Sequence, residues 1–277
     1  MEDWKKLFSG TVRYIDQRGK AGRDDAIASF AYDDALAISV GNETSPPAAR
    51  LWVHDKTLIL GIPDAKLPNV DAALQWLAGH GYQAVVRNSG GLAVVLDAGV
   101  LNLSFILPDA KGIGIHEGYQ FMVTFIQDLF RNLTTEIKAF EVKGSYCPGD
   151  YDLSIRGQKF AGISQRRVKN GSAVQIYLCV EGSGRERAEL VRHFYEIGRK
   201  GKSNRFEYPE VKPETMASLT ELLSIQLTVD DVCKSIHQAL ASVSTSINEQ
   251  SLDSAEQQAF EKRLEQMKER NIKALGS

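Results

Sequence analysis

Hydrophobic residues recur along the chain with two different periods, and these periods divide it into expected helices and strands. In some stretches an apolar residue stands at every third or fourth position, as Val70, Leu74 and Leu77 do, which is typical of an amphipathic helix. In other stretches apolar and polar residues alternate, which is typical of a half-buried strand. An alanine-rich segment that ends at Gly41 predicts a helix at 24–40. The first period predicts helices at 69–79, 117–130, 185–197, 214–226 and 228–244, and a surface helix from residue 254 onward.

The strand pattern occurs in short segments separated by turn-forming residues. These segments are 51–55, 57–61, 82–87, 92–96, 100–107, 137–142, 152–156, 159–168 and 172–180. Glycine-containing turns at 88–91 and 97–99 lead us to expect an antiparallel meander of the three strands that they separate. Asn170 and Gly171 predict a hairpin between the last two segments. The order of elements predicts an α/β (α+β) fold with a mixed, mainly antiparallel sheet flanked by helices.

Composition narrows the class of protein. With 277 residues, 43% of them hydrophobic and 25% charged, the chain can bury a core for one large domain or two small ones. The formal net charge of -2 gives no basic footprint, so we do not expect nucleic acid as a partner. No apolar run approaches the roughly 18 residues of a spanning helix, and residues 1–6 lack an apolar signal region. We therefore expect a cytoplasmic protein that does not bind a membrane.

The three cysteines have different surroundings. They are odd in number and widely spaced, which argues against a disulfide framework and against a zinc site, and no other metal site is expected. Cys179 lies in an alternating strand segment and Cys233 in a helical one, so both are expected to be buried small hydrophobic residues. Cys147 lies in a polar turn next to Pro148. It is a candidate nucleophile, although a structural role remains open.

Lys159 follows Cys147 by twelve residues, after a turn expected at Gly157 and Gln158. A nearby ammonium lowers the pKa of a cysteine thiol from its usual value of about 8.5 and so produces the nucleophilic thiolate. The alternative is a solvated lysine on a strand. The five histidines are scattered and expected to be surface or structural residues, and the basic segment 199–205 is expected to be solvated or to contact an acidic partner protein.

Small and polar residues near these two positions could bind a substrate. Glycine turns leave backbone N–H groups free to meet an acyl carbonyl or carboxylate, although such a segment can also be a simple hairpin turn. Small strand residues allow close approach of a ligand. The candidate substrate-binding residues are Arg87, Ser89, Gly90, Gly91, Ala161, Gly162 and Ser164.

Four segments, taken in order, resemble those of the biotin/lipoate protein ligase and transferase superfamily. Residues 87–104 and 157–166 are similar to its two signature segments, and 33–37 and 49–54 to its opening helix and first strand. The resemblance implies a biotin/lipoate ligase-like catalytic domain over residues 25–248 and a helical tail over 249–277. It also implies an acyl tunnel lined by strand residues near Val94 and Ile163.

Two departures and one addition narrow the resemblance within this superfamily. The glycine run at Ser89-Gly90-Gly91 is short, and Leu96 stands where lipoate ligases commonly have histidine, which argues against ATP-dependent ligation. The pairing of Cys147 with Lys159 resembles the cysteine-dependent octanoyltransferases, in particular the octanoyl-[glycine cleavage H protein]:protein N-octanoyltransferases of Gram-positive bacteria.

This resemblance implies a reaction and two protein partners. Cys147 would carry the acyl group as a thioester and Lys159 would lower the pKa of its thiol. An octanoyl or lipoyl group would pass from a lysine of the glycine cleavage H protein to the lipoyl-domain lysine of E2 subunits of 2-oxoacid dehydrogenases, without ATP or a metal. Three alternatives remain open: transfer from octanoyl-acyl carrier protein, ATP-dependent lipoate ligation, and a non-catalytic module that binds lipoyl or biotinyl proteins.

Overall fold

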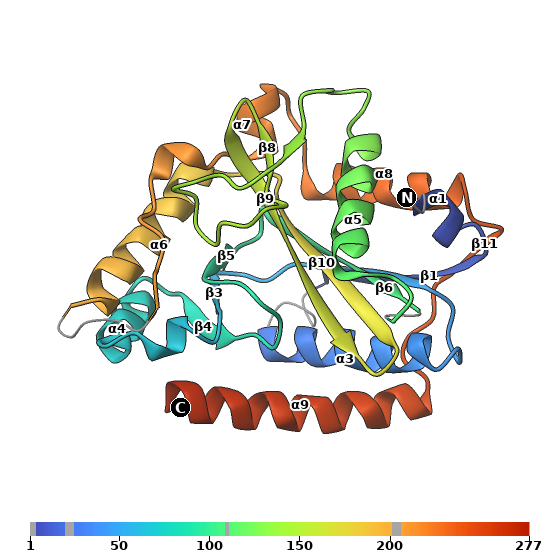
Figure 1. Cartoon of the computed structure of the whole chain (residues 1–277), viewed down its shortest axis with the longest axis horizontal. Helices are drawn as coiled ribbons and strands as arrows, with labels where there is room; N and C mark the ends of the chain where they lie inside the picture. Colours follow the sequence, from blue (N-terminus) through green and yellow to red (C-terminus); the bar gives the residue numbers. More distant parts are fainter. Residues whose placement is uncertain (1–3, 20–24, 109–110, 201–205, 277) are drawn as a thin grey trace.

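Two β-sheets organise the fold of the computed structural model, which describes residues 4–19, 25–108, 111–200 and 206–276 (Figure 1). In the larger sheet β1 (Thr11–Gln17) is parallel to both of its neighbours, and the other neighbouring pairs are antiparallel. The predicted mixed, mainly antiparallel sheet flanked by helices is therefore confirmed. Its eight strands are, in spatial order, β11 (Ser246–Asn248), β1 (Thr11–Gln17), β2 (Ala48–Trp52), β6 (Val100–Leu107), β10 (Gly171–Cys179), β9 (Gln158–Val168), β8 (Leu153–Ile155) and β7 (Lys138–Ala139).

The second sheet has three strands and corrects the expected meander. β3 (Thr57–Leu60) lies in its centre, parallel to β4 (Gln83–Val86) and antiparallel to β5 (Val94–Leu96). β6 pairs with β2 and β10 in the large sheet instead. The meander prediction is wrong because turn residues mark where a chain reverses, whereas pairing depends on burial. All eight residues of β6 are buried, so it lies in the interior of the larger sheet.

The helices mostly match the hydrophobic period. They are α1 (Trp4–Leu7), α3 (Ala26–Gly41), α4 (Val70–Gly79), α5 (Ile115–Leu129), α6 (Gly184–Gly198), α7 (Leu219–Leu223), α8 (Val229–Ala241) and α9 (Ser254–Leu275), with short 3-10 turns η1 (Asp64–Lys66) and η2 (Pro213–Thr215).

Three local predictions need correction. The expected helix 214–226 is wrong, because the chain forms η2, leaves the helix, and begins α7 only after the capping box of Ser218 and Glu221. The expected strand 137–142 is reduced to the two residues of β7. β1 and β11 were not predicted. The basic segment 199–205 lies mostly outside the described residues, which resume at Phe206.

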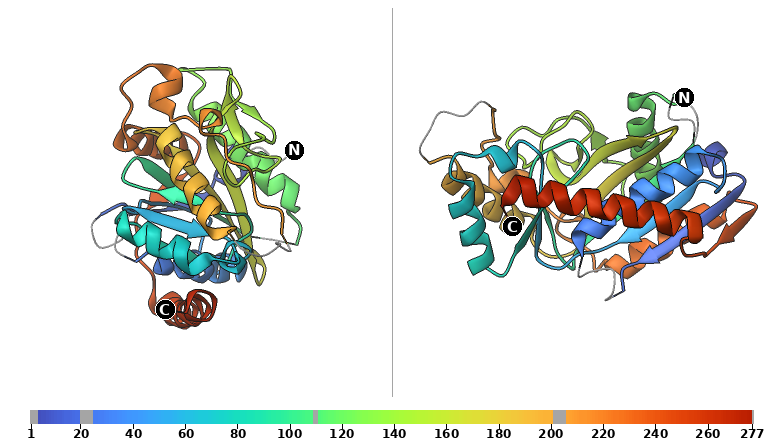
Figure 2. Two further views of the ribbon diagram at one scale, coloured as in Figure 1. Left: turned by 90° about the vertical axis from the view of Figure 1, so that its left-hand side faces the viewer. Right: turned by 90° about the horizontal axis from the view of Figure 1, so that it is seen from below.

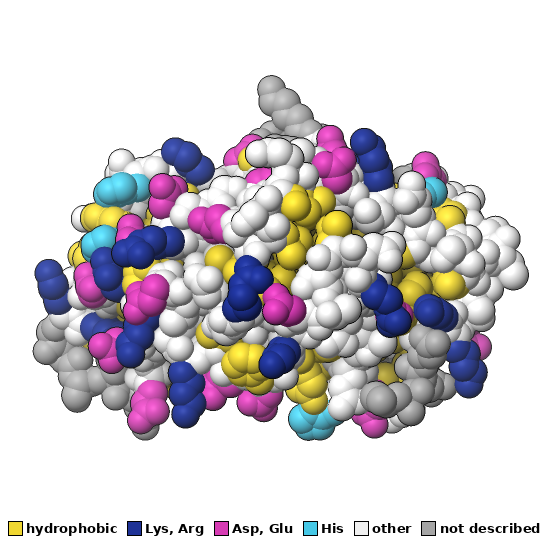
Figure 3. All heavy atoms as spheres, turned by 90° about the horizontal axis from the view of Figure 1, so that it is seen from above, with side chains coloured by type: hydrophobic (Ala, Val, Ile, Leu, Met, Phe, Trp, Pro, Cys, Tyr) yellow, Lys and Arg dark blue, Asp and Glu magenta, His cyan; other side chains and the backbone are white. Residues whose placement is uncertain are grey.

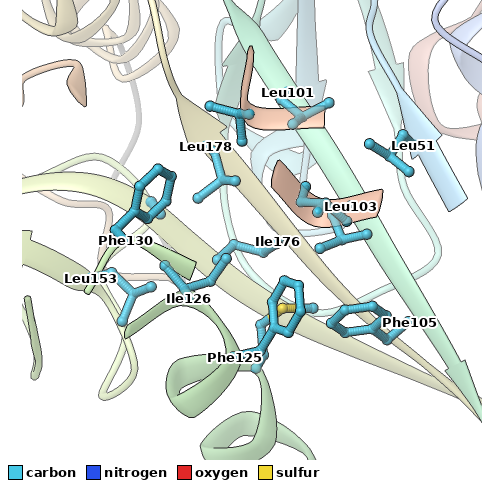
Figure 4. Packing of buried hydrophobic residues seen from close by; sticks show 14 of the residues in the cluster. Leu51, Leu101, Leu103, Phe105, Phe125, Ile126, Phe130, Leu153, Ile176 and Leu178 are labelled. Atoms are coloured by element: carbon cyan, nitrogen blue, oxygen red, sulfur yellow. The ribbon is translucent and has the colours of Figure 1, made fainter. Parts of the chain in front are cut away.

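Helices cover both faces of the large sheet. On one face, the ring of Phe125 in α5 meets that of Phe105 in β6 edge to face, with centroids 4.8 Å apart, and Ile126 packs beside Ile176 (Figure 4). On the other face, Leu36 and Val40 of α3 belong to a second buried cluster. α9 lies outside α3 and runs along it (Figures 1 and 2). The order of layers is therefore α5, sheet, α3, α9.

The surface carries charges of both signs. Figure 3 shows acidic and basic side chains interspersed around hydrophobic ones on one face, which accords with the small formal net charge of -2. Within the described parts of the chain, no helix is long and apolar enough to cross a bilayer.

Candidate active site

Cys147 lies in the loop between β7 and β8 and has an unusual backbone conformation. Its φ is +45°, in the left-handed region that residues other than glycine, asparagine and aspartate rarely adopt. The side chain is half-buried, whereas Cys179 and Cys233 are buried as predicted. Residues held in this region cluster at active sites when the surrounding structure fixes them. The thiol is thus presented by a strained and well-supported turn.

Lys159 supplies much of this support. The β8–β9 hairpin turns at Arg156 and Gly157, one residue before the predicted position. It places Lys159 against the loop that carries Cys147. The side chain is fully buried, and its Nζ lies 2.8 Å from Asp152 Oδ1. It donates hydrogen bonds to the carbonyl oxygens of Tyr146, at 3.0 Å, and Cys147, at 2.7 Å. The ammonium therefore holds the two carbonyls on either side of the strained Cys147 backbone.

Asp152 binds two backbone N–H groups of the same loop. The sequence analysis did not identify it as a site residue. Its Oδ2 accepts hydrogen bonds from the backbone N–H groups of Val142 and Gly149, both at 3.2 Å. Burial raises the pKa of the Asp152 carboxyl, and the Lys159 ammonium offsets part of this rise. Asp152 could have been identified from the predicted hairpin, which places the segment 152–156 beside the strand that carries Lys159.

Among the described residues, two N–H groups lie within hydrogen-bonding distance of the Cys147 sulfur, and neither belongs to Lys159. The backbone N–H of Leu92 donates to Sγ at 3.1 Å, and a terminal guanidinium nitrogen of Arg87 lies 3.4 Å from it. The same guanidinium nitrogen donates to the Leu92 carbonyl at 2.7 Å. A cation and an N–H dipole at this distance both favour negative charge on sulfur. Arg87, predicted to bind substrate, thus places a cationic group at the thiol.

The glycine turn between β4 and β5 makes this approach possible. Gly91 has a φ of +105°, and a β-carbon added to it would lie 2.2 Å from the Arg87 guanidinium and 2.9 Å from the Cys147 sulfur. Gly90 has no atom within 4 Å of an added β-carbon. Only one of the two glycines predicted here is therefore required by contact with the thiol.

A buried chain of hydrogen bonds supports the turn from inside the protein. Asp64 accepts hydrogen bonds from the Gly61 N–H at 2.7 Å and from the Tyr195 hydroxyl at 2.9 Å. The Tyr195 oxygen in turn accepts the N–H of Ala93 at 3.3 Å, one residue after the Leu92 N–H that meets sulfur. Burial raises the pKa of Asp64 to about 6. Asp64 and Tyr195 are 131 positions apart, and sequence reasoning did not identify either.

A cavity of about 290 Å³ opens beside the thiol. This is near the lower end of the range of about 300–1,000 Å³ found for ligand pockets. Val94 and Ile163, expected near an acyl tunnel, both line it, together with Phe30 and Trp52. Of the sequence-predicted site residues, Arg87, Gly90, Gly91, Cys147, Gly162 and Ser164 are in its wall, whereas Ser89, Lys159 and Ala161 are buried but outside its described lining.

Three further side chains of the wall belong to an aromatic group at its α5 side. The rings of Tyr119 and Tyr151 stack with centroids 4.9 Å apart, and a ring nitrogen of His116 lies 3.0 Å from the Tyr151 hydroxyl. The histidine is exposed, as expected, but it shares the cavity with Cys147. Among the described residues, no group of three or more His, Cys, Asp or Glu side chains could hold a metal ion.

Comparison with known proteins gives the family. The chain is 55% identical over 276 residues to the octanoyl-[GcvH]:protein N-octanoyltransferase of Oceanobacillus iheyensis, covering 98% of this chain and 99% of that protein. It is 47% identical to the lipoyl-[GcvH]:protein N-lipoyltransferase of Listeria monocytogenes, over 95% of each chain. A crystal structure of lipoate-protein ligase A bound with ATP has the same fold, with a TM-score of 0.70, 18% identity, and coverage of 92% of this chain and 94% of that one.

The model of the lipoyl protein ligase A/B catalytic domain matches residues 25–241. This match spans most of the chain and agrees with the superfamily expected from the four sequence segments. The chain belongs to the lipoyl protein ligase A/B catalytic domain family.

Proposed function

We propose that the protein is an N-octanoyltransferase of protein lipoylation. It takes an octanoyl or lipoyl group from a lysine of the glycine cleavage H protein and gives it to the lipoyl-domain lysine of E2 subunits of 2-oxoacid dehydrogenases. The observation that carries the proposal is the half-buried sulfur of Cys147, which meets Arg87 and the Leu92 N–H at the wall of a largely apolar cavity. The names of the relatives from Oceanobacillus and Listeria agree with this activity.

The first step of the proposed reaction loads the cysteine. The Cys147 thiolate attacks the carbonyl carbon of the octanoyl-lysyl amide, and a C–S bond forms as the carbonyl oxygen becomes an oxyanion. The C–N bond then breaks, and the proton that the thiol gave up ends on the released lysine amine. The product is an octanoyl thioester on Cys147. The Leu92 N–H and the Arg87 guanidinium stabilise the thiolate before the attack.

The second step transfers the octanoyl group from Cys147 to the acceptor lysine. The amine of the acceptor lysine attacks the thioester carbonyl, a C–N bond forms, and the C–S bond breaks to return the thiolate. The excess proton on nitrogen restores the thiol when the site is free. The overall reaction exchanges one lysine amide for another and is close to isoenergetic. We therefore propose that it needs neither ATP nor a metal, and that it takes place in the cytoplasm, where free thiols persist.

Lys159 acts in this proposal as a positioning residue. Its ammonium binds the carbonyl oxygens of Tyr146 and Cys147 and pairs with Asp152, all within 3.0 Å. A buried charge with these partners fixes the loop in which the sulfur lies, and its positive charge adds to the field of Arg87. Arg87 and Leu92, which meet the sulfur directly, are the groups proposed to act on the reacting atoms.

The acyl-enzyme is the decisive test. The protein is incubated with octanoylated H protein, without ATP and with EDTA, and the peptide that contains Cys147 is followed by mass spectrometry. We expect an octanoyl adduct that hydroxylamine removes, and transfer to a lipoyl domain added afterwards. Cys147→Ala should abolish both the adduct and the transfer, whereas Cys179→Ala, at a buried thiol, is the matched control. Full transfer by the Cys147→Ala variant would contradict the mechanism.

A panel of donors separates the alternatives that the sequence left open. The same assay is run with octanoyl-H protein, lipoyl-H protein and octanoyl-acyl carrier protein, and with free lipoate plus ATP. We expect adducts from the H-protein donors. Loading only from acyl carrier protein, or modification only with free lipoate and ATP, would replace the proposed donor. No adduct from any donor would indicate a binding module.

A further inference from the structure

Helix α9 lies outside the residues that match the family model, yet it is anchored to the body of the protein near both of its ends. Near its start, Glu256 is buried and lies 2.7 Å from an Arg13 guanidinium nitrogen of β1. The same carboxylate accepts the Ser39 hydroxyl of α3 at 2.5 Å. One turn further along α9, the rings of Phe260 and Tyr32 meet with centroids 5.7 Å apart. Figure 2 shows the resulting course of the helix along α3.

The second anchor is Asn271, near the other end of α9. Its side chain is only 5% exposed, and its Oδ1 accepts the backbone N–H of Val86 at 2.7 Å. Its Nδ2 donates to the backbone carbonyl of Val86 at 3.1 Å and to that of Met267 at 2.9 Å. Val86 is the last residue of β4, an edge strand of the smaller sheet. The amide of Asn271 thus pairs with Val86 as the peptide group of an adjacent strand would.

The hydrogen bonds between Asn271 and Val86 bear on the thiol because Val86 directly precedes Arg87 in the chain. Val86 is held by Asn271 on the outer edge of β4, and the next N–H, that of Arg87, donates to Leu60 in β3 at 3.0 Å. The backbone is therefore fixed on both sides where the Arg87 side chain leaves it. That side chain ends 3.4 Å from the Cys147 sulfur. A shift of the strand end would move the guanidinium directly.

We propose that Asn271 is a positioning residue and that α9 is a brace, which together hold the Arg87 guanidinium against the Cys147 sulfur. The inference rests on the proposed function only in taking Cys147 as the nucleophile. Its physical basis is that a reacting group must be held within about 0.5 Å of its productive place by neighbours that are themselves fixed. Asn271 fixes the backbone of Val86 from outside the catalytic region.

The test measures the pH dependence of Cys147 alkylation by iodoacetamide, quantified on its own peptide. Arg87→Ala should slow alkylation at neutral pH by about tenfold, the effect of losing one hydrogen bond from a charged group. Asn271→Ala should have a weaker effect of the same sign. Its alkylation at neutral pH should be about threefold slower, because the rate profile shifts to higher pH. The double variant should behave as Arg87→Ala alone, because Asn271 acts through Arg87. Lys268→Ala, on the exposed side of the same helix, should match the unchanged protein.

Three results would overturn the proposal. One is an unchanged alkylation profile in a folded Asn271→Ala variant, even if its melting temperature falls, since that indicates a merely structural role. Another is an additive effect in the double variant. If Asn271→Ala does not fold, the same comparison is made with Asn271→Ser, and an unchanged profile there has the same meaning. Because alkylation needs no acyl donor, a wrong donor assignment in the proposed function leaves this readout intact.

Discussion

At the scale of single residues, the notable point is how a cysteine is kept in a conformation that its β-carbon disfavours. The two carbonyl oxygens that flank the Cys147 side chain both face the Lys159 ammonium. A left-handed residue of this kind costs of the order of 1–3 kcal/mol. Hydrogen bonds from a charged group contribute about 1.5–3 kcal/mol each, so the lysine can offset that cost.

Replacing Lys159 by methionine tests this role. The change leaves Asp152 buried without its cation and the two carbonyls without a donor, so we expect the free energy of unfolding to fall by about 3–5 kcal/mol and transfer to be lost. Denaturant unfolding and the transfer assay measure the two effects. The double variant with Asp152→Asn should regain part of the stability but not the activity. Full activity in Lys159→Met would remove the lysine from the site.

The sequence identified the cysteine and the lysine but not which atoms meet. The hairpin pattern brings Lys159 close to the loop, whereas the direction of its ammonium depends on Asp152 and on the turn of the loop carbonyls. The cation at the sulfur, Arg87, comes from 60 positions earlier in the chain. Its contact depends on how the smaller sheet docks on the larger one, which periodicity does not encode.

At the scale of elements, the glycine turn after β4 brings a backbone N–H to the thiol. The two glycines of this turn give a matched pair of substitutions. Gly91→Ala places a methyl group 2.2 Å from the Arg87 guanidinium at a φ of +105°, whereas Gly90→Ala meets no atom within 4 Å. We expect Gly91→Ala to lower the transfer rate by about a hundredfold, since misplacing a reacting group by about 1 Å has that effect. Gly90→Ala should retain most of the activity.

The two variants are compared in the transfer assay and in the alkylation profile of Cys147. Equal losses in both variants would indicate that the turn as a whole, rather than the contact at Gly91, matters. Equal retention would show that the turn can move away from the thiol without harm.

Element types could be predicted better than element partners. The amphipathic helices α5 and α8 have the period that the sequence shows. α3 is buried on most of its sides, so its alanine-rich composition rather than a period indicated a helix, and Asp25 and Thr228 are the side-chain caps of α3 and α8. β11 has only three residues, too few to show alternation. The pairing of β4 and β5 with β3 needed knowledge of which strands are buried on both faces. Periodicity reports one strand at a time, so it does not show which strands pair in the smaller sheet.

At the scale of the whole molecule, the pH dependence of stability should carry a contribution from Asp64. Burial raises its pKa from 3.8 to about 6, so the folded state holds a proton that the unfolded state has lost between these values. Stability therefore falls as pH rises from about 4 to 6, by about 3 kcal/mol from this group. The lowered pKa values of Glu221 and Glu256 act in the opposite sense, with stability that is lost as pH falls.

The difference between the protein and its Asp64→Asn variant isolates that contribution. Urea unfolding of both is measured from pH 4 to pH 7.5. We expect the free energy of unfolding of the variant to rise relative to that of the protein as pH increases, and the difference to level off above pH 6.5. A difference that does not change with pH would show that Asp64 titrates normally in the folded state.

The family and the fold class could both be predicted from the sequence, and both are confirmed. They rest on ordered segments that each keep a local pattern. Contacts such as those of Asp64 with Tyr195 and Asn271 with Val86 join positions 131 and 185 apart, so only the folded chain reveals them.

The ends of the large sheet have a consequence for solubility. Its longest strands, β9 and β10, lie in the interior, whereas the terminal strands β11 and β7 have three and two residues. A long free edge offers unpaired N–H and C=O groups on which another chain can add, and that is a common route to aggregation. Here the terminal strands themselves offer only a few such groups, because they end after three and two residues. Among the described strands, residues 162–168 of β9 pair with β10 alone, so this stretch is a part of the edge on which another chain could add.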